Sequence, residues 1–266
     1  MPTREQAWPE GTPNWVEVAV DHPHEAAAYY RKLFGWECYE AGPEPGDYIL
    51  AFKDGHPAAA IGPKDADELP ASWATFFAVE DADETARRVR AAGGDAHFDP
   101  VDVGPNGRMF FATSPDGASF GVWQAGDHTG VGIFNEPGSL ALNVLHTDDL
   151  TLARDFYAEV FGFSYRDLSR PELDLFALLR SSDGSGVAAM STNKVAPQGT
   201  PPHWMTWFAV ENCDESAIMA CRLGGRVLVE PEDTPFGRTA VVSGTEGEVF
   251  GVVDLRRTRK LVAVAS

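Results

Sequence analysis

Two side chains in strand-like segments have the chemistry to take up or release a proton. Glu17 lies within the segment Trp15–Val20, and His146 lies at the end of a second such segment, Leu140–His146. Burying an unpaired carboxylate is costly, so we expect Glu17 to be exposed, paired, or turned toward a wet cleft. A buried carboxyl group would have a raised pKa and could act as a general base, and His146 could act in the same way. For His146, a hydrogen-bonded structural role is the alternative.

Aromatic residues alternate along the strand-like segments in step with these two side chains. If the valines of Trp15–Val20 pack against a helix, Trp15 and Glu17 point to the opposite face. The same alternation predicts further cleft residues, namely Tyr48, Phe76, Ser119 and Trp123 beside Glu17, and Met205 and Trp207 beside His146. Such a pocket suits a flat apolar molecule with a polar edge. Aromatic residues at strand spacing are equally typical of a buried core, and that alternative stays open for each of them.

An internal repeat organises the elements that must position these residues. The segment TFFAVEDADETARRVRAAGG, which begins at Thr75, matches TWFAVENCDESAIMACRLGG, which begins at Thr206. Closer to the start of each copy, Phe34-Gly35 matches Phe161-Gly162, and the tripeptide FGV closes both copies. The chain is therefore predicted to contain two copies of one unit.

Each copy contains a fainter repeat of its own, in which a strand and a helix are followed by three short strands. The segment 73–79 reads as a strand and 83–92 as a helix, which ends at Gly93-Gly94. The strands expected after it are 96–103, 108–113 and 119–124.

The predicted fold class is therefore α+β, with curled mixed sheets around clefts. We expect four βαβββ modules, at 14–66, 72–126, 139–193 and 203–255. They form two paired-module domains, residues 1–134 and 135–266. Which modules share a cleft stays open at this point.

These motifs resemble the vicinal oxygen chelate superfamily. The βαβββ repeat, the aromatic pair before Phe-Gly at the helix end, and the closing turn with FGV carry the resemblance. That superfamily includes glyoxalase I, extradiol dioxygenases, fosfomycin-resistance enzymes and bleomycin-binding proteins. The paired GGD/GGR, GR and FGV motifs look like its four-module actinobacterial branch, labelled glyoxalase-like or hydroxylase. The resemblance implies the fold, but many chemistries share that fold.

Metal-dependent members of that superfamily place a His on the first strand of a module pair, a His on the fifth and a Glu on the eighth. The resemblance puts these positions at Trp15, Ala74 and Gly121 in the first copy, and at Leu142, Met205 and Gly251 in the second. None of the six side chains can bind a metal ion. His146 and His203 offer a pair of imidazoles, but no carboxylate falls at the matching position on the eighth strand. We therefore expect no metal and no other cofactor.

Composition excludes several classes of partner. The chain has 40 Asp and Glu against 21 Lys and Arg, a formal net charge of −19 at pH 7, which repels nucleic acid and anionic membrane surfaces. No apolar run reaches the roughly 20 residues of a membrane span, and none at the N-terminus reads as a signal peptide. The three cysteines form no CxxC pair. We expect a cytoplasmic monomer or homodimer, whose partner is a hydrophobic or aromatic small molecule.

Three functions follow from these observations. The favoured one is a metal-independent protein that binds an aromatic or polyketide-like natural product, for sequestration, resistance or an auxiliary biosynthetic role. The second is a metal-independent enzyme, a cyclase, isomerase or cofactor-free oxygenase, in which Glu17 or His146 moves a proton. A metal-dependent lyase or dioxygenase is the least favoured, because the ligand positions lack ligands.

Overall fold

Each copy of the repeat builds one sheet. The computed structural model describes residues 2–41, 48–66, 68–171, 173–193, 200–234 and 236–258. Within these, the first sheet contains β1 (Pro13–Val20), β2 (Glu37–Glu40), β3 (Ile49–Lys53), β4 (His56–Pro63), β5 (Ser72–Val79), β6 (Asp95–Ala96), β7 (Val101–Asp102), β8 (Gly107–Thr113) and β9 (Ser119–Ala125). The second contains β10 (Leu140–Thr147), β11 (Ser164–Asp167), β12 (Leu175–Leu179), β13 (Gly186–Thr192), β14 (His203–Ala209), β15 (Arg226–Thr234), β16 (Gly237–Ser243) and β17 (Val249–Asp254). The helices are α1 (Pro23–Phe34), α2 (Ala82–Ala91), α3 (Leu150–Phe161), α4 (Cys213–Arg222) and the short 3₁₀ helix η2 (Leu255–Arg257).

Consecutive modules share a sheet. The strand order is β2-β3-β4-β1-β5-β9-β8-β6 in the first half, with β7 paired to β8, and β11-β12-β13-β10-β14-β17-β16-β15 in the second. The two modules of each half meet at an antiparallel pair, β1 with β5 and β10 with β14, whereas β1 runs parallel to β4 and β10 to β13. The α+β prediction with curled mixed sheets is confirmed, and the pairing that the sequence left open lies within each half.

Helix ends follow from local sequence. Gly35 and Gly162 end α1 and α3 in the left-handed conformation, with φ of 71° and 70°, which a glycine adopts without steric cost. Asp149 caps the start of α3 by accepting from two backbone N–H groups. The start of α1 has no cap from its own chain segment. Instead Glu246, from the other half, accepts from the backbone N–H groups of Asp21 and His22.

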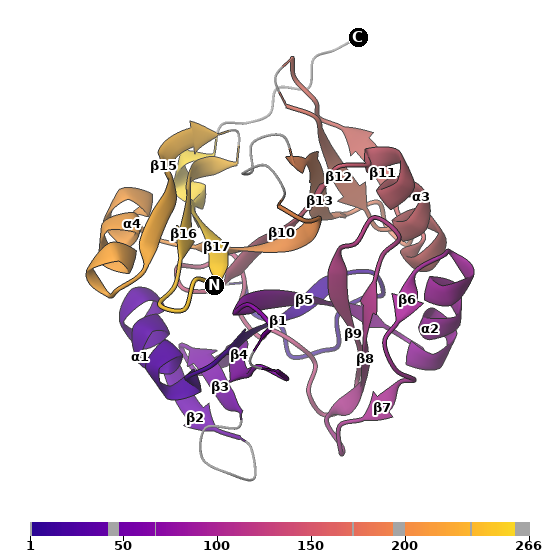
Figure 1. Cartoon of the computed structure of the whole chain (residues 1–266), viewed down its shortest axis with the longest axis horizontal. Helices are drawn as coiled ribbons and strands as arrows, with labels where there is room; N and C mark the ends of the chain where they lie inside the picture. The colour runs from indigo at the N-terminus through magenta and orange to yellow at the C-terminus, as the bar shows by residue number, and fades with distance from the viewer. Residues whose placement is uncertain are drawn as a thin grey trace.

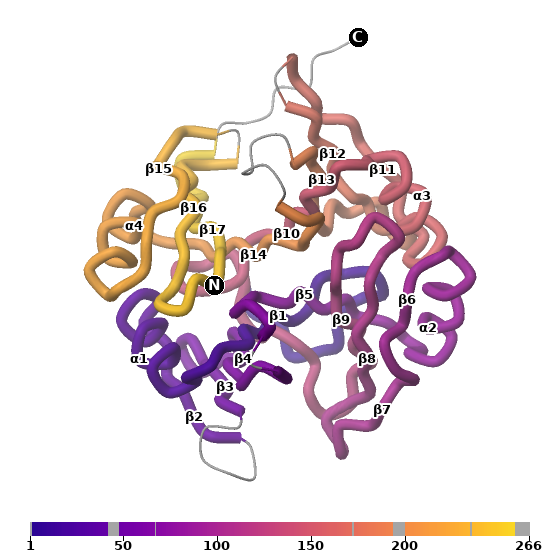
Figure 2. Tube along the Cα trace, in the orientation of Figure 1, coloured from indigo at the N-terminus to yellow at the C-terminus, as the bar shows by residue number. Residues whose placement is uncertain are grey.

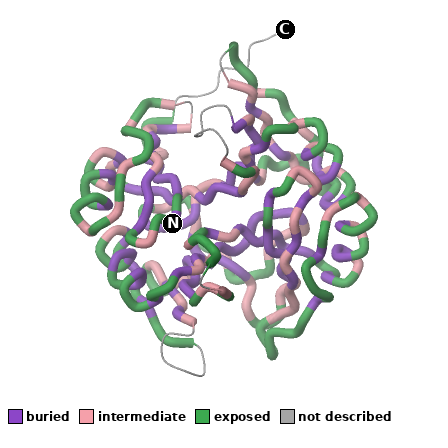
Figure 3. The backbone as a smooth tube through the Cα atoms, viewed as in Figure 1, coloured by how far each residue is buried: buried purple, intermediate pink, exposed green. Residues whose placement is uncertain are grey.

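The two sheets pack back to back through their helix-covered faces. Figure 1 shows α1 next to α4 on one side of the molecule and α2 next to α3 on the other. One apolar cluster between the halves contains Tyr30, Trp36, Phe208 and Phe250, and another contains Phe77, Phe120, Tyr157 and Trp204. In Figure 3 buried residues follow the central strands. The uncovered concave face of each sheet therefore points outward.

Polar contacts at the centre fix the halves against each other. Asn143 Nδ2 on β10 donates to Thr75 Oγ1 on β5 (2.7 Å). The N-terminal segment runs along the joint, residues 126–139 between β9 and β10, where the backbone N–H of Arg4 donates to Gly132 O (2.9 Å). In Figure 2 the label of the N-terminus lies left of the centre of the view, between the labels of β17 and β1.

One predicted element differs from the structure. The strand expected at 96–103 is broken into β6 and β7. Pro100 lies in the gap, and proline has no backbone N–H to donate to a neighbouring strand. In the described ranges, no helix combines the length and the apolar character that crossing a membrane requires.

Candidate functional site

Glu17 lies at the centre of the concave face of the first sheet. Its neighbours Val16 and Val18 are buried on the helix-covered face, so alternation along β1 turns Glu17 to the other side. In register, Ala60 of β4 and Ala74 of β5 flank Glu17. The residues on either side of the carboxylate are therefore alanines, whose side chains are single methyl groups.

Tyr48 forms a hydrogen-bonded pair with Glu17. The Tyr48 hydroxyl, just before β3, donates to Glu17 Oε2 over 3.0 Å. Burial raises the pKa of Glu17 to about 7; the hydrogen bond from Tyr48 opposes this shift and the charge of Asp65 adds to it. Burial also raises the pKa of the Tyr48 phenol. Glu17 is therefore suited to exchange a proton near neutral pH, with Tyr48 holding one of its oxygens.

Like Tyr48, several apolar side chains that are partly open to solvent pack against the core cluster that contains Trp15 and Phe76. They are Leu50, Ala74, Met109 and Phe111. In register, Leu50 faces Ala60, and Phe111 faces Gly121. Sequence reasoning missed Leu50, Met109 and Phe111 as cleft residues. The signal was present, because Met109 and Phe111 alternate in step with each other in the segment GRMFF.

The large aromatic residues predicted to line this cleft lie deeper. Trp15, Phe76 and Trp123 are only 3%, 2% and 7% exposed. His128, from the joint, packs edge-on against Trp15 with ring centroids 4.3 Å apart, and its carbonyl accepts from Trp123 Nε1 (2.9 Å). These aromatic residues are therefore almost closed off from solvent and do not line an open wall. No strand pattern could place His128, which follows the last strand of the half.

Ser119, at the start of β9, takes part in a different set of hydrogen bonds from Glu17. It is exposed, and its hydroxyl is 3.1 Å from Thr113 Oγ1 on β8, which in turn is 2.7 Å from His97 Nε2. The structure therefore brings Glu17 and Tyr48 into direct contact and places Ser119 in a separate polar group.

The concave face of the second sheet contains the other predicted residues. His146 faces His203 in register, and their rings stack with centroids 5.3 Å apart. Burial, assisted by His203, lowers the pKa of His146 to about 4, so this imidazole is neutral at pH 7. Met205 pairs with Val144, and Trp207 with Leu142. Nε2 of His146 and Nε1 of Trp207 are buried without a hydrogen-bond partner.

The six positions assigned to metal ligands do not fit a metal ion. A Cβ atom at Gly121 would overlap the ring of Phe76, and one at Gly251 would overlap the ring of Trp207. An aromatic ring therefore occupies the space that a carboxylate ligand would need in each half. Among the described residues, no three His, Cys, Asp or Glu side chains are grouped closely enough to hold a metal.

Comparison with known proteins relates both halves to one family. The family model described as "Glyoxalase/Bleomycin resistance protein/Dioxygenase superfamily" matches residues 12–122 and 139–252. The chain is 36% identical over 260 residues to "Putative glyoxylase CFP32" of Mycobacterium tuberculosis, covering 95% of this chain and 98% of that protein. It is 34% identical over 262 residues to "Anthracycline biosynthesis protein DnrV" of Streptomyces peucetius, covering 92% and 94%.

Solved structures share the architecture. The Mn(II)-bound glyoxalase from Novosphingobium aromaticivorans has a TM-score of 0.64 at 18% identity, covering 93% of this chain and 83% of that one. The 2,3-dioxygenase LapB from Pseudomonas sp. KL28 has a TM-score of 0.63 at 18% identity, covering 92% and 93%. At such identities the likeness concerns the fold alone.

Proposed function

Because the chain belongs to the glyoxalase/bleomycin resistance protein/dioxygenase superfamily, we propose that it binds a planar aromatic or polyketide-like natural product in the cleft of the first sheet, without a metal ion. The role would be sequestration, resistance or auxiliary biosynthesis. The site is the concave face around Glu17 and Tyr48, and the bound molecule would lie over Leu50, Ala74 and Phe111.

The observation that carries this proposal is the Glu17–Tyr48 pair set in an apolar surface. A flat ring system gains free energy by covering the half-buried side chains around the pair. A hydroxyl group at its edge can donate to the Glu17 carboxylate, the acid at the centre of this face. The arrangement thus selects an aromatic molecule with a polar edge over a purely apolar one.

The relatives support a natural-product ligand. DnrV, one of the relatives matched along nearly the whole chain, is named as an anthracycline biosynthesis protein. Anthracyclines are fused-ring aromatic polyketides with hydroxyl and carbonyl groups at their edges, which is the chemistry that the first cleft favours.

A metal-independent enzyme is the second candidate, and the pKa of Glu17 favours it. A carboxyl group with a pKa of about 7 is half ionised near neutral pH and can both accept and return a proton. Tyr48 engages Oε2, so Oε1 is the atom left to take a proton from a bound hydroxyl or an activated C–H group. Cyclisation, isomerisation or cofactor-free oxygenation would use such a base.

Binding is tested with 1,4-dihydroxyanthraquinone as the probe, in the presence of a chelator. Quenching of tryptophan fluorescence should be saturable. Ala74→Leu fills the space beside Glu17 and should weaken binding at least tenfold. Ala177→Leu is the matched control, because Ala177 pairs in register with Ala189 on the concave face of the second sheet. Absence of saturable quenching, or equal weakening in both variants, would overturn the proposal.

Turnover distinguishes the two candidates. The wild type and Glu17→Gln are incubated with the probe and with related hydroxyquinones, and the mixtures are resolved by mass spectrometry. Binding without any product in either protein supports the binding function. A product that forms with the wild type and is lost with Glu17→Gln supports the enzyme.

A further inference from the structure

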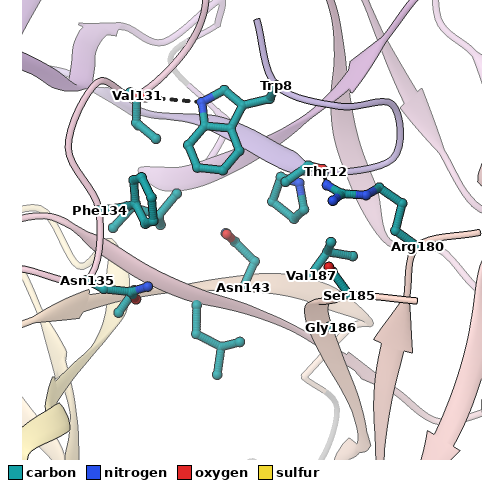
Figure 4. Close-up of a pocket in the computed structure, with 14 residues that line it drawn as sticks. Trp8, Thr12, Val131, Phe134, Asn135, Asn143, Arg180, Ser185, Gly186 and Val187 are labelled. Carbon is teal, nitrogen blue, oxygen red and sulfur yellow. Dashed lines mark hydrogen bonds between the residues drawn. The ribbon is translucent and has the colours of Figure 1, made fainter. Parts of the chain in front are cut away.

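A cavity lies at the seam between the two halves, apart from the concave face of the first sheet. It has a volume of about 260 Å³. Its walls come from the N-terminal segment, the joint, the start of β10, and the chain between β12 and β13 with the start of β13 (Figure 4). They include Trp8, Thr12, Phe134, Asn143 and Arg180. The cleft proposed above shares none of these residues.

The pseudo-symmetry of the chain explains why this space is open. In the first half, the joint fills the corresponding place. The backbone N–H of Val131 donates to Asn14 O (2.7 Å), and that of Gly132 donates to Pro57 O (2.7 Å). Ala141 is the counterpart of Asn14, since each lies at the irregularity where the first strand meets the fifth. In the second half, Ala141 instead borders the cavity.

The cavity has an aromatic wall held in place by a hydrogen bond. Trp8 Nε1 donates to Val131 O (3.1 Å), and Trp8 packs edge-on against Phe134 with ring centroids 5.1 Å apart. Leu142 and Val187 also line the cavity, and Figure 4 shows Val187 across it from Trp8. A single aromatic ring fits between these walls, because the volume is just below the ~300–1,000 Å³ of pockets for larger ligands.

Two polar side chains face this space from different elements. Asn143 is only 2% exposed, and its Nδ2 is engaged by Thr75, which leaves Oδ1 as an acceptor that points into the cavity in Figure 4. The Arg180 side chain is 12% exposed; Nε and Nη2 donate to Asp183, and Nη1 donates to Thr12 Oγ1 (2.7 Å). A guanidinium has five N–H groups, so two remain for a ligand oxygen.

We propose that the seam cavity binds a one-ring aromatic acid that carries a hydroxyl group. The carboxylate accepts from the free N–H groups of Arg180, the ring lies against Trp8 and Phe134, and the hydroxyl donates to Asn143 Oδ1. The Asp183 carboxylate offsets part of the positive charge of Arg180. The affinity for the ligand therefore depends on the hydroxyl contact and the ring packing as well as on the ion pair. This site stands independently of the function proposed for the first cleft.

The test is a calorimetric titration of the full chain with 4-hydroxybenzoate at pH 7. We expect saturable binding at one site per chain, and binding of phenol, which lacks the carboxylate, at least tenfold weaker. Arg180→Lys keeps the charge but loses the planar fork, and should weaken 4-hydroxybenzoate about tenfold. Ala141→Leu fills the cavity and should also weaken it at least tenfold, whereas Ala177→Leu should change the affinity less than twofold.

Three results would overturn the proposal: no saturable heat, equal affinity for phenol and 4-hydroxybenzoate, or an affinity that neither cavity variant changes. Circular dichroism checks the folding of each variant. If Ala141→Leu does not fold, the comparison of the two ligands on the wild-type protein still decides the question.

Discussion

Replacing Glu17 with glutamine should make the protein progressively more stable than the wild type as the pH rises. The pKa of Glu17 is about 7 in the folded protein, against 4.5 for an ordinary glutamate. The folded state therefore favours the protonated acid, and its stability falls as the pH rises from 4.5 to 7. The glutamine side chain of the variant keeps an oxygen for the Tyr48 hydroxyl but has no charge to bury.

The size of the effect follows from the same values. Each pKa unit is worth about 1.36 kcal/mol, so complete ionisation would destabilise the fold by at most about 3.4 kcal/mol. Glu17 keeps some contact with water in the cleft, and solvent screening reduces the expected effect to about 2 kcal/mol. Other titrating groups are the same in both proteins and cancel in the difference.

The assay is urea unfolding of both proteins at several pH values between 4.5 and 8, followed by tryptophan fluorescence. The free energy of unfolding of Glu17→Gln minus that of the wild type should rise by about 2 kcal/mol and level off above pH 7. The matched control is Glu37→Gln, since Tyr39 makes the same kind of hydrogen bond to Glu37 (2.7 Å) at the exposed surface. If the difference in free energy of unfolding between Glu17→Gln and the wild type does not change with pH, or rises equally for Glu37→Gln, Glu17 is not a buried carboxyl group with a raised pKa.

Three further changes test other parts of the structure. His146→Leu should unfold at a lower pH than the wild type. Burial lowers the pKa of His146 from 6.5 to about 4, so the wild type loses stability as the pH falls through this range. Equal midpoints of acid unfolding in the two proteins would contradict this. Glu246→Ala removes an acceptor for the His22 N–H (2.8 Å) at the start of α1 and should lower the free energy of unfolding by about 1 kcal/mol. An unchanged midpoint of urea unfolding would argue that Glu246, from the second half, does not stabilise the start of α1 in the first. Gly121→Ala forces the Phe76 ring to move and should cost about 1–3 kcal/mol, visible as a lower melting temperature; an unchanged melting temperature would show that the ring adjusts freely.

The repeat made most of the fold predictable. Glu17 could be assigned to a helix-free face because the flanking valines alternate with it, and the structure places Val16 and Val18 in the core. The sequence could not predict which modules pair, because pairing within a half and pairing across the halves would bury the same apolar faces. The register of Glu17 with Ala74 settles it within the half.

The burial of Trp15 and Trp123 involves a residue outside every periodic segment. Trp15 and Trp123 have the alternation of cleft residues, yet His128 from the joint covers them. The hydrogen bond between the His128 carbonyl and Trp123 Nε1 joins a strand to a segment without strand periodicity. Such a contact follows from the path of the joint, which no local pattern predicts.

The N-terminal segment extends the repeat further than the sequence comparison suggested. The backbone N–H of Gly11 donates to Ala78 O (2.8 Å), and that of Gly138 donates to Ala209 O (2.8 Å). Both glycines have positive φ, 77° and 87°. The motif Gly-Thr before β1 and Gly-Ser before β10 was a usable signal, but only the two glycines are identical. This segment is also what builds the seam cavity.

A titration of chelator-treated protein with 1,4-dihydroxyanthraquinone between pH 5.5 and 8.5 tests the central proposal most directly. Binding should be saturable without any added metal, should tighten as Glu17 ionises near pH 7, and should lose that pH dependence in Glu17→Gln. Binding that is absent until a divalent metal ion is added would contradict the account.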